Sequence, residues 1–208
     1  MIEKAENLIA RIISYLFHPV VLPTYAMLLL LNMKFYFSMV IPVQARWMII
    51  GFVFITTCLL PLMMVHLMER LKIISSKHMP TRQERIWPFA ITALFYYITY
   101  HLLNRLDLPA LYIVLIFGAF LNVALSLIIT FFYKISTHMI AIGGLCGAFI
   151  GLSLKFGLDM PLLIITLIFI SGLVGFARLK LNAHSPLQVL TGFFAGFIIF
   201  IYLLLRQG

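Results

Sequence analysis

The sequence predicts an all-α membrane protein, a polytopic transmembrane helical bundle of six to seven spans. Three observations support this prediction. First, 63% of the 208 residues are hydrophobic and 10% are charged, whereas a soluble domain is about half apolar and a quarter charged. Second, apolar runs near the roughly 17 to 25 residues needed to cross a bilayer core recur along the chain. Third, the charged residues gather in short stretches between these runs.

The N-terminal part is expected to contain an interfacial helix followed by membrane spans. Residues 1–14 alternate apolar and charged side chains and lack a cleavage site, which is typical of an interfacial amphipathic helix. Residues 15–76 are assigned to N-terminal spans. The run 15–31 contains Pro19 and Pro23, so it is either a kinked span or a re-entrant piece, and the total is seven or six accordingly. His18 is interpreted as a polar contact at the kink.

The clearer spans come later in the chain, and residues 77–208 are expected to form the membrane core. Pro88 is expected in the first turn of its helix, where its missing N–H costs nothing. Gly143, Gly147 and Gly151 recur every four residues, which lets a neighbouring helix approach closely and predicts a central helix. The expected spans are residues 47–67, 87–103, 110–133, 139–154, 161–176 and 187–205.

Three polar islands, residues 77–85, 134–138 and 178–184, are separated by two crossings each, so we expect them on one side of the membrane. Several arginines that converge there would bind phosphate or sulfate oxygens. Histidines can attack phosphorus and protonate a leaving oxygen. This inventory favours a phosphatase that needs neither metal nor another cofactor, since no third ligand has zinc-site spacing. The islands carry Lys77, Arg82, Arg85, Ser136, His138, Arg178 and His184.

At these residues the chain resembles the membrane-bound type 2 phosphatidic acid phosphatase family, which is related to the vanadium haloperoxidases. The family's S-R-x5-H-x3-D motif is matched by Ala177-Arg178-x5-His184-x3-Gln188. Its P-S-G-H motif is matched by Ile135-Ser136-Thr137-His138. Its K-x6-R-P motif is met loosely, because seven residues separate Lys77 from Arg85 and the proline arrives at Pro88.

The resemblance implies a role for each matched residue. His184 would be the nucleophile that forms a phosphohistidine, and His138 the general acid. Arg178, Arg85 and Ser136 would bind the phosphate. Either Lys77 or Arg82 would replace the first-motif lysine. The implied substrate is a lipid phosphate or an isoprenyl diphosphate, which makes the chain a phosphoric monoester or diphosphate hydrolase of a bacterial inner (plasma) membrane, with its site facing the periplasm.

Gln188 departs from this pattern, because the family has an aspartate there. A glutamine carbonyl still fixes the tautomer of a histidine but supplies no charge to the imidazolium. A second interpretation is local, since Ser185-Pro186-Leu187-Gln188 has the pattern of a capping box. Each arginine is also interpretable as an interfacial anchor, and Ser136 as a helix N-cap.

Competing functions differ in how well the sequence fits them. A membrane prenyltransferase needs aspartate clusters, and the aspartates are Asp107 and Asp159, on the opposite face. The net charge of +9 favours anionic lipid over nucleic acid as a partner. The main alternative is a non-catalytic phospholipid-binding or assembly protein that retains the phosphatase fold. The positive-inside rule leaves the orientation open, and the oligomeric state is not predicted.

Overall fold

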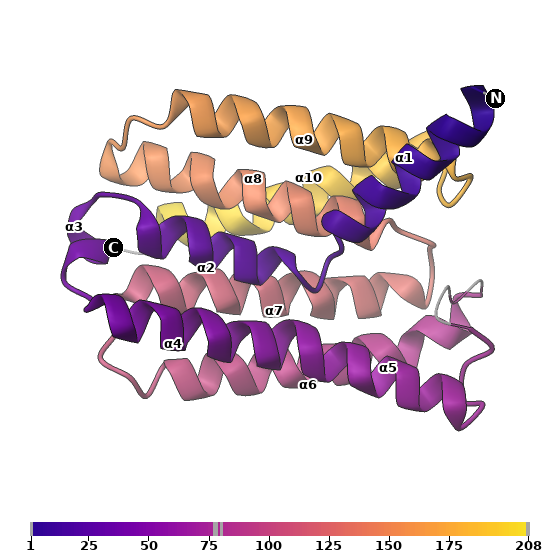
Figure 1. Cartoon of the computed structure of the whole chain (residues 1–208), viewed down its shortest axis with the longest axis horizontal. Helices are drawn as coiled ribbons and strands as arrows, with labels where there is room; N and C mark the ends of the chain where they lie inside the picture. The colour runs from indigo at the N-terminus through magenta and orange to yellow at the C-terminus, as the bar shows by residue number, and fades with distance from the viewer. Residues whose placement is uncertain (1, 77–78, 80, 207–208) are drawn as a thin grey trace. The chain divides into compact units, whose positions relative to one another are not determined.

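The computed structural model describes residues 2–76, 79 and 81–206 of the chain. Among these residues every regular element is a helix, and six helices are long and apolar enough to cross a membrane. The chain is therefore a polytopic helical bundle, as predicted (Figure 1). The elements are α1 (Ile2–Leu16), α2 (Leu22–Asn32), α3 (Tyr36–Met39), α4 (Val43–Phe54), the π-helical η1 (Ile55–Leu59), α5 (Leu60–Arg70), α6 (Gln83–Leu103), α7 (Ala110–Thr130), α8 (Thr137–Phe156), α9 (Pro161–Lys180) and α10 (Pro186–Arg206).

The run predicted as one kinked or re-entrant piece over residues 15–31 is instead divided between two helices. Helix α1 continues to Leu16, the chain leaves helical geometry around Pro19, and α2 begins at Leu22. With 11 residues, α2 is about 17 Å long at 1.5 Å per residue, too short for a hydrocarbon core of about 30 Å. Residues 15–31 therefore form no single kinked helix, and the structure favours the lower count of six spans.

Two further helix boundaries differ from the prediction. Helix α6 begins at Gln83, where the Glu84 N–H donates to Thr81 Oγ1, so Pro88 lies inside the helix rather than in its first turn. Helix α9 continues to Lys180, so Arg178 belongs to its last turn and not to the following loop. Polar side chains at the end of an apolar helix do not end it, since their long stems reach the interface.

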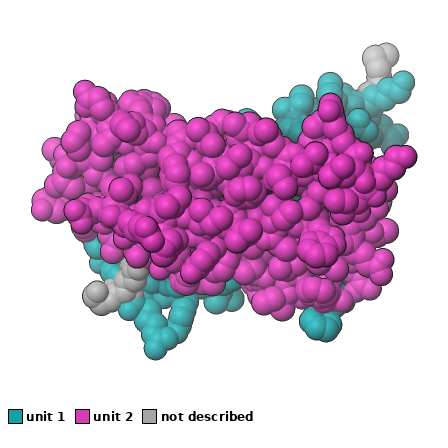
Figure 2. Space-filling view, turned by 90° about the horizontal axis from the view of Figure 1, so that it is seen from below, with its two compact units in different colours: residues 1–19, 132–208 teal, residues 20–131 magenta. Residues whose placement is uncertain are grey.

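The chain divides into two compact units, which Figure 2 shows in different colours. Unit 1 comprises Met1–Pro19 and Phe132–Gly208, and unit 2 comprises Val20–Phe131. In unit 2, α6 packs along α7, and the longest span, Val43–Arg70, includes the π-helical turn η1. The wider π-helical turn lies just before Pro61, which has no N–H to donate to the carbonyl of Thr57, so the regular α-helical hydrogen bond is missing there.

Unit 1 is built around α8, which is buried over 67% of its span, the largest share among the six spans of the described residues. Helix α10 packs along α8 through glycines on both helices. A Cβ at Gly143 would collide with the backbone oxygen of Phe193, and one at Gly196 with that of Ile140. The sequence prediction that this glycine-rich helix is central and closely approached is confirmed. Helices α9 and α1 complete the unit, with α1 packed against α9 (Figure 1).

Candidate functional site

The turn that joins α9 to α10 is fixed by local rules of helix termination. After α9, Asn182 adopts a left-handed conformation with φ 50°, and the Ala183 N–H donates to the carbonyl of Arg178. This is a helix end of the Schellman type, in which asparagine tolerates the left-handed geometry. Helix α10 starts directly afterwards with Pro186 in its first position. His184 is thus held just outside the start of one helix and close to the end of another.

Gln188 carries both roles that its sequence context suggests. Its N–H lies 3.4 Å from Ser185 Oγ, and its Oε1 accepts the Ser185 N–H at 3.2 Å, which completes a capping box. The same Oε1 lies 3.1 Å from His184 Nδ1. Because the Ser185 N–H identifies this atom as an acceptor, His184 donates from Nδ1 and keeps its lone pair on Nε2. This tautomer is the one that a nucleophilic histidine needs.

The start of α8 brings a second group of predicted residues to the same end of unit 1. Ser136 occupies the N-cap position and is completely buried, yet its hydroxyl makes no capping bond, and no described group hydrogen-bonds to its Oγ. A Cβ at Gly192 would lie 2.8 Å from the Ser136 carbonyl oxygen, so the start of α8 is in close contact with the second turn of α10. The positive end of the α8 dipole and the Ser136 hydroxyl therefore lie at the end of unit 1 where α10 begins, shortly after His184 in the chain.

Arg178 and His138 both contact Ser14, a residue that the sequence analysis did not select. Arg178 Nη1 donates to Ser14 Oγ at 3.2 Å, and His138 Nε2 donates to the Ser14 carbonyl at 3.2 Å. The acceptor is a carbonyl, so it fixes the Nε2–H tautomer of His138. Through Ser14, Arg178 in the last turn of α9 is brought close to His138 in the first turn of α8. Four predicted site residues, Ser136, His138, Arg178 and His184, thus belong to one end of unit 1.

His18 joins this group from the break after α1. Its ring lies edge-on to that of His138, with the ring centroids 5.3 Å apart. Burial, and after it the nearby charge of Arg178, lower the pKa of His18 from 6.5 to about 4, so its imidazole is neutral at pH 7. No hydrogen-bond partner of its Nδ1 is present in the described part of the chain. The interpretation of His18 as a simple kink contact therefore omits its place beside His138.

The other predicted phosphate-binding cations are outside unit 1. Arg85, in the first turn of α6, donates from Nε to the Met79 carbonyl at 3.1 Å and is half-buried. Arg82 is exposed and precedes the same helix. Both belong to unit 2, and Lys77 lies outside the described residues.

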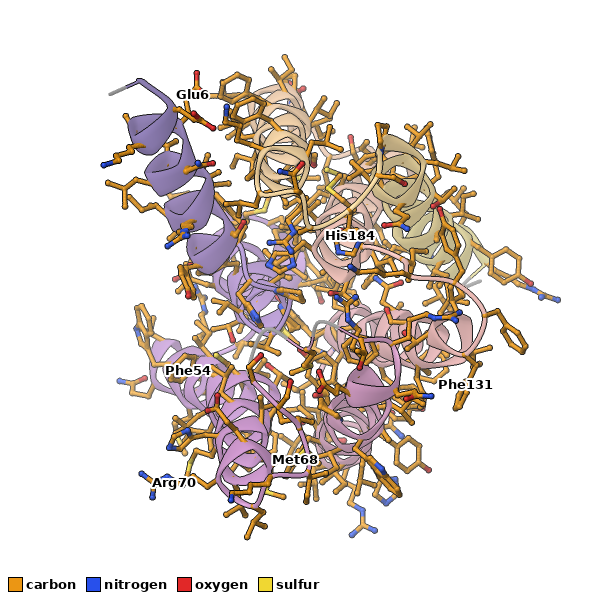
Figure 3. The ribbon with its side chains drawn as sticks, turned by 90° about the vertical axis from the view of Figure 1, so that its right-hand side faces the viewer. Glu6, Phe54, Met68, Arg70, Phe131 and His184 are labelled. Atoms are coloured by element: carbon orange, nitrogen blue, oxygen red, sulfur yellow. The ribbon has the colours of Figure 1, made fainter. Side chains whose placement is uncertain are left out.

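Ser14 and His18 are the site residues that sequence reasoning missed. The signal available was weak: a serine on the polar side of an amphipathic helix, and a histidine before a proline. Figure 3 looks onto the end of the molecule where Glu6, on the same helix, and His184 are found. Only the packing of α1 on α9 brings residues separated by more than 120 positions into contact with His138 and Arg178.

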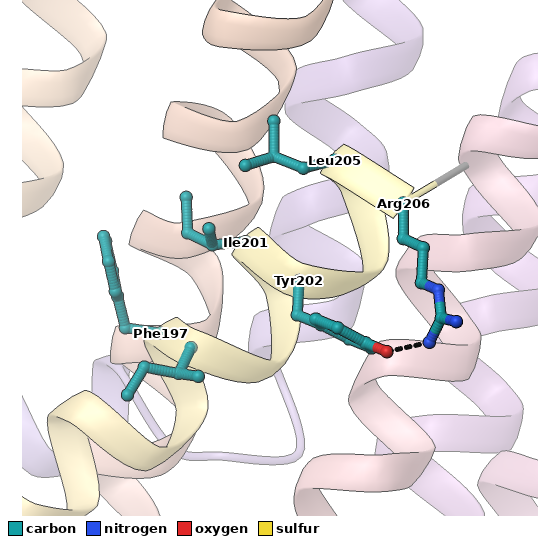
Figure 4. Close-up of a pocket in the computed structure, with 6 residues that line it drawn as sticks. Phe197, Ile201, Tyr202, Leu205 and Arg206 are labelled. Carbon is teal, nitrogen blue, oxygen red and sulfur yellow. Dashed lines mark hydrogen bonds between the residues drawn. The ribbon is translucent and has the colours of Figure 1, made fainter. Parts of the chain in front are cut away.

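A second feature of unit 1 lies far from these residues. A shallow hollow of about 460 Å³ follows the C-terminal half of α10, where Arg206 contacts Tyr202 (Figure 4). It is at the opposite end of the 21-residue helix from Gln188, about 27 Å away at 1.5 Å per residue. The hollow is lined by Phe197, Ile198, Ile201, Tyr202, Leu205 and Arg206.

The donor set at the histidine end of unit 1 suits an oxyanion. It combines a guanidinium, a buried hydroxyl, a helix N-terminus and two imidazoles of fixed tautomer. Within the described part of the chain, no three histidine, cysteine, aspartate or glutamate side chains are grouped so that they could hold a metal ion. Comparison of the chain with models of known families, with curated proteins and with solved structures found no match.

Proposed function

We propose that the protein is a lipid phosphate phosphohydrolase that works through a phosphohistidine on His184. The observation that carries the proposal is the hydrogen bond from His184 Nδ1 to Gln188 Oε1, because it places the ring proton on Nδ1 and so makes Nε2 the basic, nucleophilic nitrogen. Arg178, the Ser136 hydroxyl and the N-terminus of α8 would bind the phosphate oxygens. Apolar spans and the sequence resemblance to type 2 phosphatidic acid phosphatases support a lipid substrate in a bacterial inner membrane, with the site facing the periplasm.

The proposed reaction proceeds in two balanced steps. His184 Nε2 forms a bond to phosphorus while the bond from phosphorus to the lipid oxygen breaks, and His138, which must enter this step as the imidazolium, gives that oxygen a proton and becomes neutral. Water then attacks the phosphohistidine, His138 takes the proton from the water, and the phosphorus–nitrogen bond breaks to release phosphate. Gln188 would hold the ring of His184 in both steps. Its neutral amide supplies less stabilisation to the imidazolium than a carboxylate would.

One observation favours a second function, a non-catalytic protein that binds phospholipid. Ser14 already contacts both Arg178 and His138, the cation and the proton donor that the reaction requires. If these contacts persist, Arg178 and His138 do not take part in turnover, and the protein would bind phospholipid without hydrolysing it.

Phosphate release from a panel of lipid phosphates and isoprenyl diphosphates by the purified protein, with chelator present, tests the proposal. The matched variants are His184→Ala and Arg178→Ala, with His101→Ala, an exposed histidine of unit 2, as the control. Release that both site variants abolish and the control retains is the expected result. If the folded protein releases no more phosphate than His184→Ala on every substrate, the phosphatase is refuted and the binding protein is favoured.

A further inference from the structure

Helix α1 has its two faces reversed relative to an ordinary amphipathic helix of a soluble protein. The side directed at the protein is small and polar: Ala10 is 0% and Ser14 8% exposed, and Glu6 pairs with Lys180 of α9. The opposite side is apolar and exposed by 52–70% at each position. It consists of Leu8, Ile9, Ile12, Tyr15 and Leu16.

The exposed apolar face of α1 matches acyl chains rather than water. Helix α1 packs on α9, whose own outer surface is apolar and exposed at Leu162, Ile165 and Phe169. Helix α9 is one of the six candidate membrane spans, so its outer surface faces lipid. The apolar face of α1 contacts lipid whether the helix is packed on α9 or has moved away from it. Because lipid is as favourable for leucine as protein is, this face adds little free energy that would hold α1 in the packed position.

The polar contacts from α1 to Arg178, His138 and Lys180 lie near its two ends, and the helix is followed by a break in helical geometry. Ser14 bonds to Arg178 and His138, and the partly exposed pair between Glu6 and Lys180 fastens the other end of the helix. Beyond Leu16 the chain leaves helical geometry before Pro19, where the backbone can change direction. The two oxygens of Ser14 occupy the donors of Arg178 and His138 that a phosphate and a leaving oxygen would use.

We propose that α1 is a lipid-facing gate, in which Ser14 occupies the site when it is closed and hinged movement of α1 admits a lipid phosphate head group from the bilayer. The proposal rests on the proposed function for the identity of the ligand. The gate itself is a property of α1 that is measurable without catalysis. It also explains how a site closed by Ser14 is compatible with turnover.

Thiol labelling with N-ethylmaleimide in lipid nanodiscs tests the gate independently of activity. In Ala10→Cys the new thiol lies on the inner face, in Arg11→Cys it lies at the neighbouring exposed and charged position, and the native Cys146 is 1% exposed. Arg11→Cys should label at once, Cys146 should stay unlabelled, and Ala10→Cys should label slowly. Adding Glu6→Gln removes the partly exposed ion pair and should speed Ala10→Cys labelling about two- to fivefold.

Two results of this labelling would overturn the gate. One is an Ala10→Cys thiol that stays as unreactive as Cys146, and the other is a labelling rate that Glu6→Gln leaves unchanged. Ser14→Cys provides a second inner-face thiol at nearly constant volume, so a folding defect of the first variant does not decide the matter. The substitution Lys4→Gln, at an exposed position of the same helix, is the control for a general effect of charge.

Cross-linking connects the gate to the reaction. A short bismaleimide between cysteines in Glu6→Cys/Lys180→Cys should lower phosphate release at least tenfold relative to the same protein before cross-linking, whereas the two single variants treated alike should keep their rates. Unchanged release after complete cross-linking would refute the gate and leave the phosphatase standing. Absence of release from wild-type protein would refute the phosphatase, while the labelling rates still decide whether α1 opens.

Discussion

Replacing Gln188 by leucine is the sharpest test of the histidine chemistry. The side chain keeps nearly its size but loses Oε1, which accepts from His184 Nδ1 at 3.1 Å and from the Ser185 N–H at 3.2 Å. A hydrogen bond to a charged group contributes about 1.5–3 kcal/mol, and the ring of His184 becomes charged when Nε2 attacks phosphorus. At about 1.4 kcal/mol per factor of ten, kcat should fall roughly 10- to 150-fold.

Gln188→Asp should act in the opposite direction, because a carboxylate forms a charge-assisted bond about twice as strong as a neutral one. We expect kcat to rise about tenfold. Both rates are measured by phosphate release in detergent, and ¹⁵N NMR of labelled His184 reports the tautomer directly: Nδ1–H in the wild-type protein and a mixture in Gln188→Leu.

Ser185→Ala separates orientation from capping. It removes the hydroxyl that accepts the Gln188 N–H but leaves Oε1 beside His184, so it should cost about 1 kcal/mol of stability with little loss of kcat. If Ser185→Ala lowers kcat as much as Gln188→Leu does, or if Gln188→Leu keeps the full rate, the orienting role of Gln188 is refuted.

Three further predictions concern packing, pH and metal. Gly196→Ala places a methyl group against a backbone carbonyl of α8 and should destabilise unit 1 by about 1–3 kcal/mol. The loss is measured as exposure of the Cys146 thiol at a lower temperature, in a Cys58→Ala background. The control Gly172→Ala, whose added Cβ would have no atom within 4 Å, should change the stability little. The pKa of His18 is lowered to about 4 in the folded protein, so unfolding binds a proton between pH 6.5 and 4. The stability of the folded protein should therefore fall as the pH drops through this window. His18→Phe should weaken this pH dependence, measured by thermal scans at pH 7 and pH 5. Phosphate release should persist in chelator and be inhibited by vanadate, and a strict requirement for a divalent ion would contradict the histidine mechanism.

Much of the architecture follows from local patterns that the sequence displays. Hydropathy and run length determine the six spans, since a bilayer core accepts few alternatives to an apolar helix. Glycines four residues apart determine that α8 and α10 pack closely. The spacing from Arg178 to His184 and Gln188 follows from one helix end and one capping box, both set by nearest neighbours in the chain. Helix ends were less predictable: α6 starts before Pro88, and α9 extends through Arg178.

Only the tertiary structure decided how α1 takes part in the site. Its sequence predicts an amphipathic helix, but periodicity does not say whether the polar face turns to water or to the protein. Packing on α9 buries Ala10 and Ser14 and sets two oxygens of Ser14 against Arg178 and His138. The same packing brings the ring of His18 against His138. Contacts across more than 120 residues leave no local pattern in a sequence, because they depend on where whole helices come to rest.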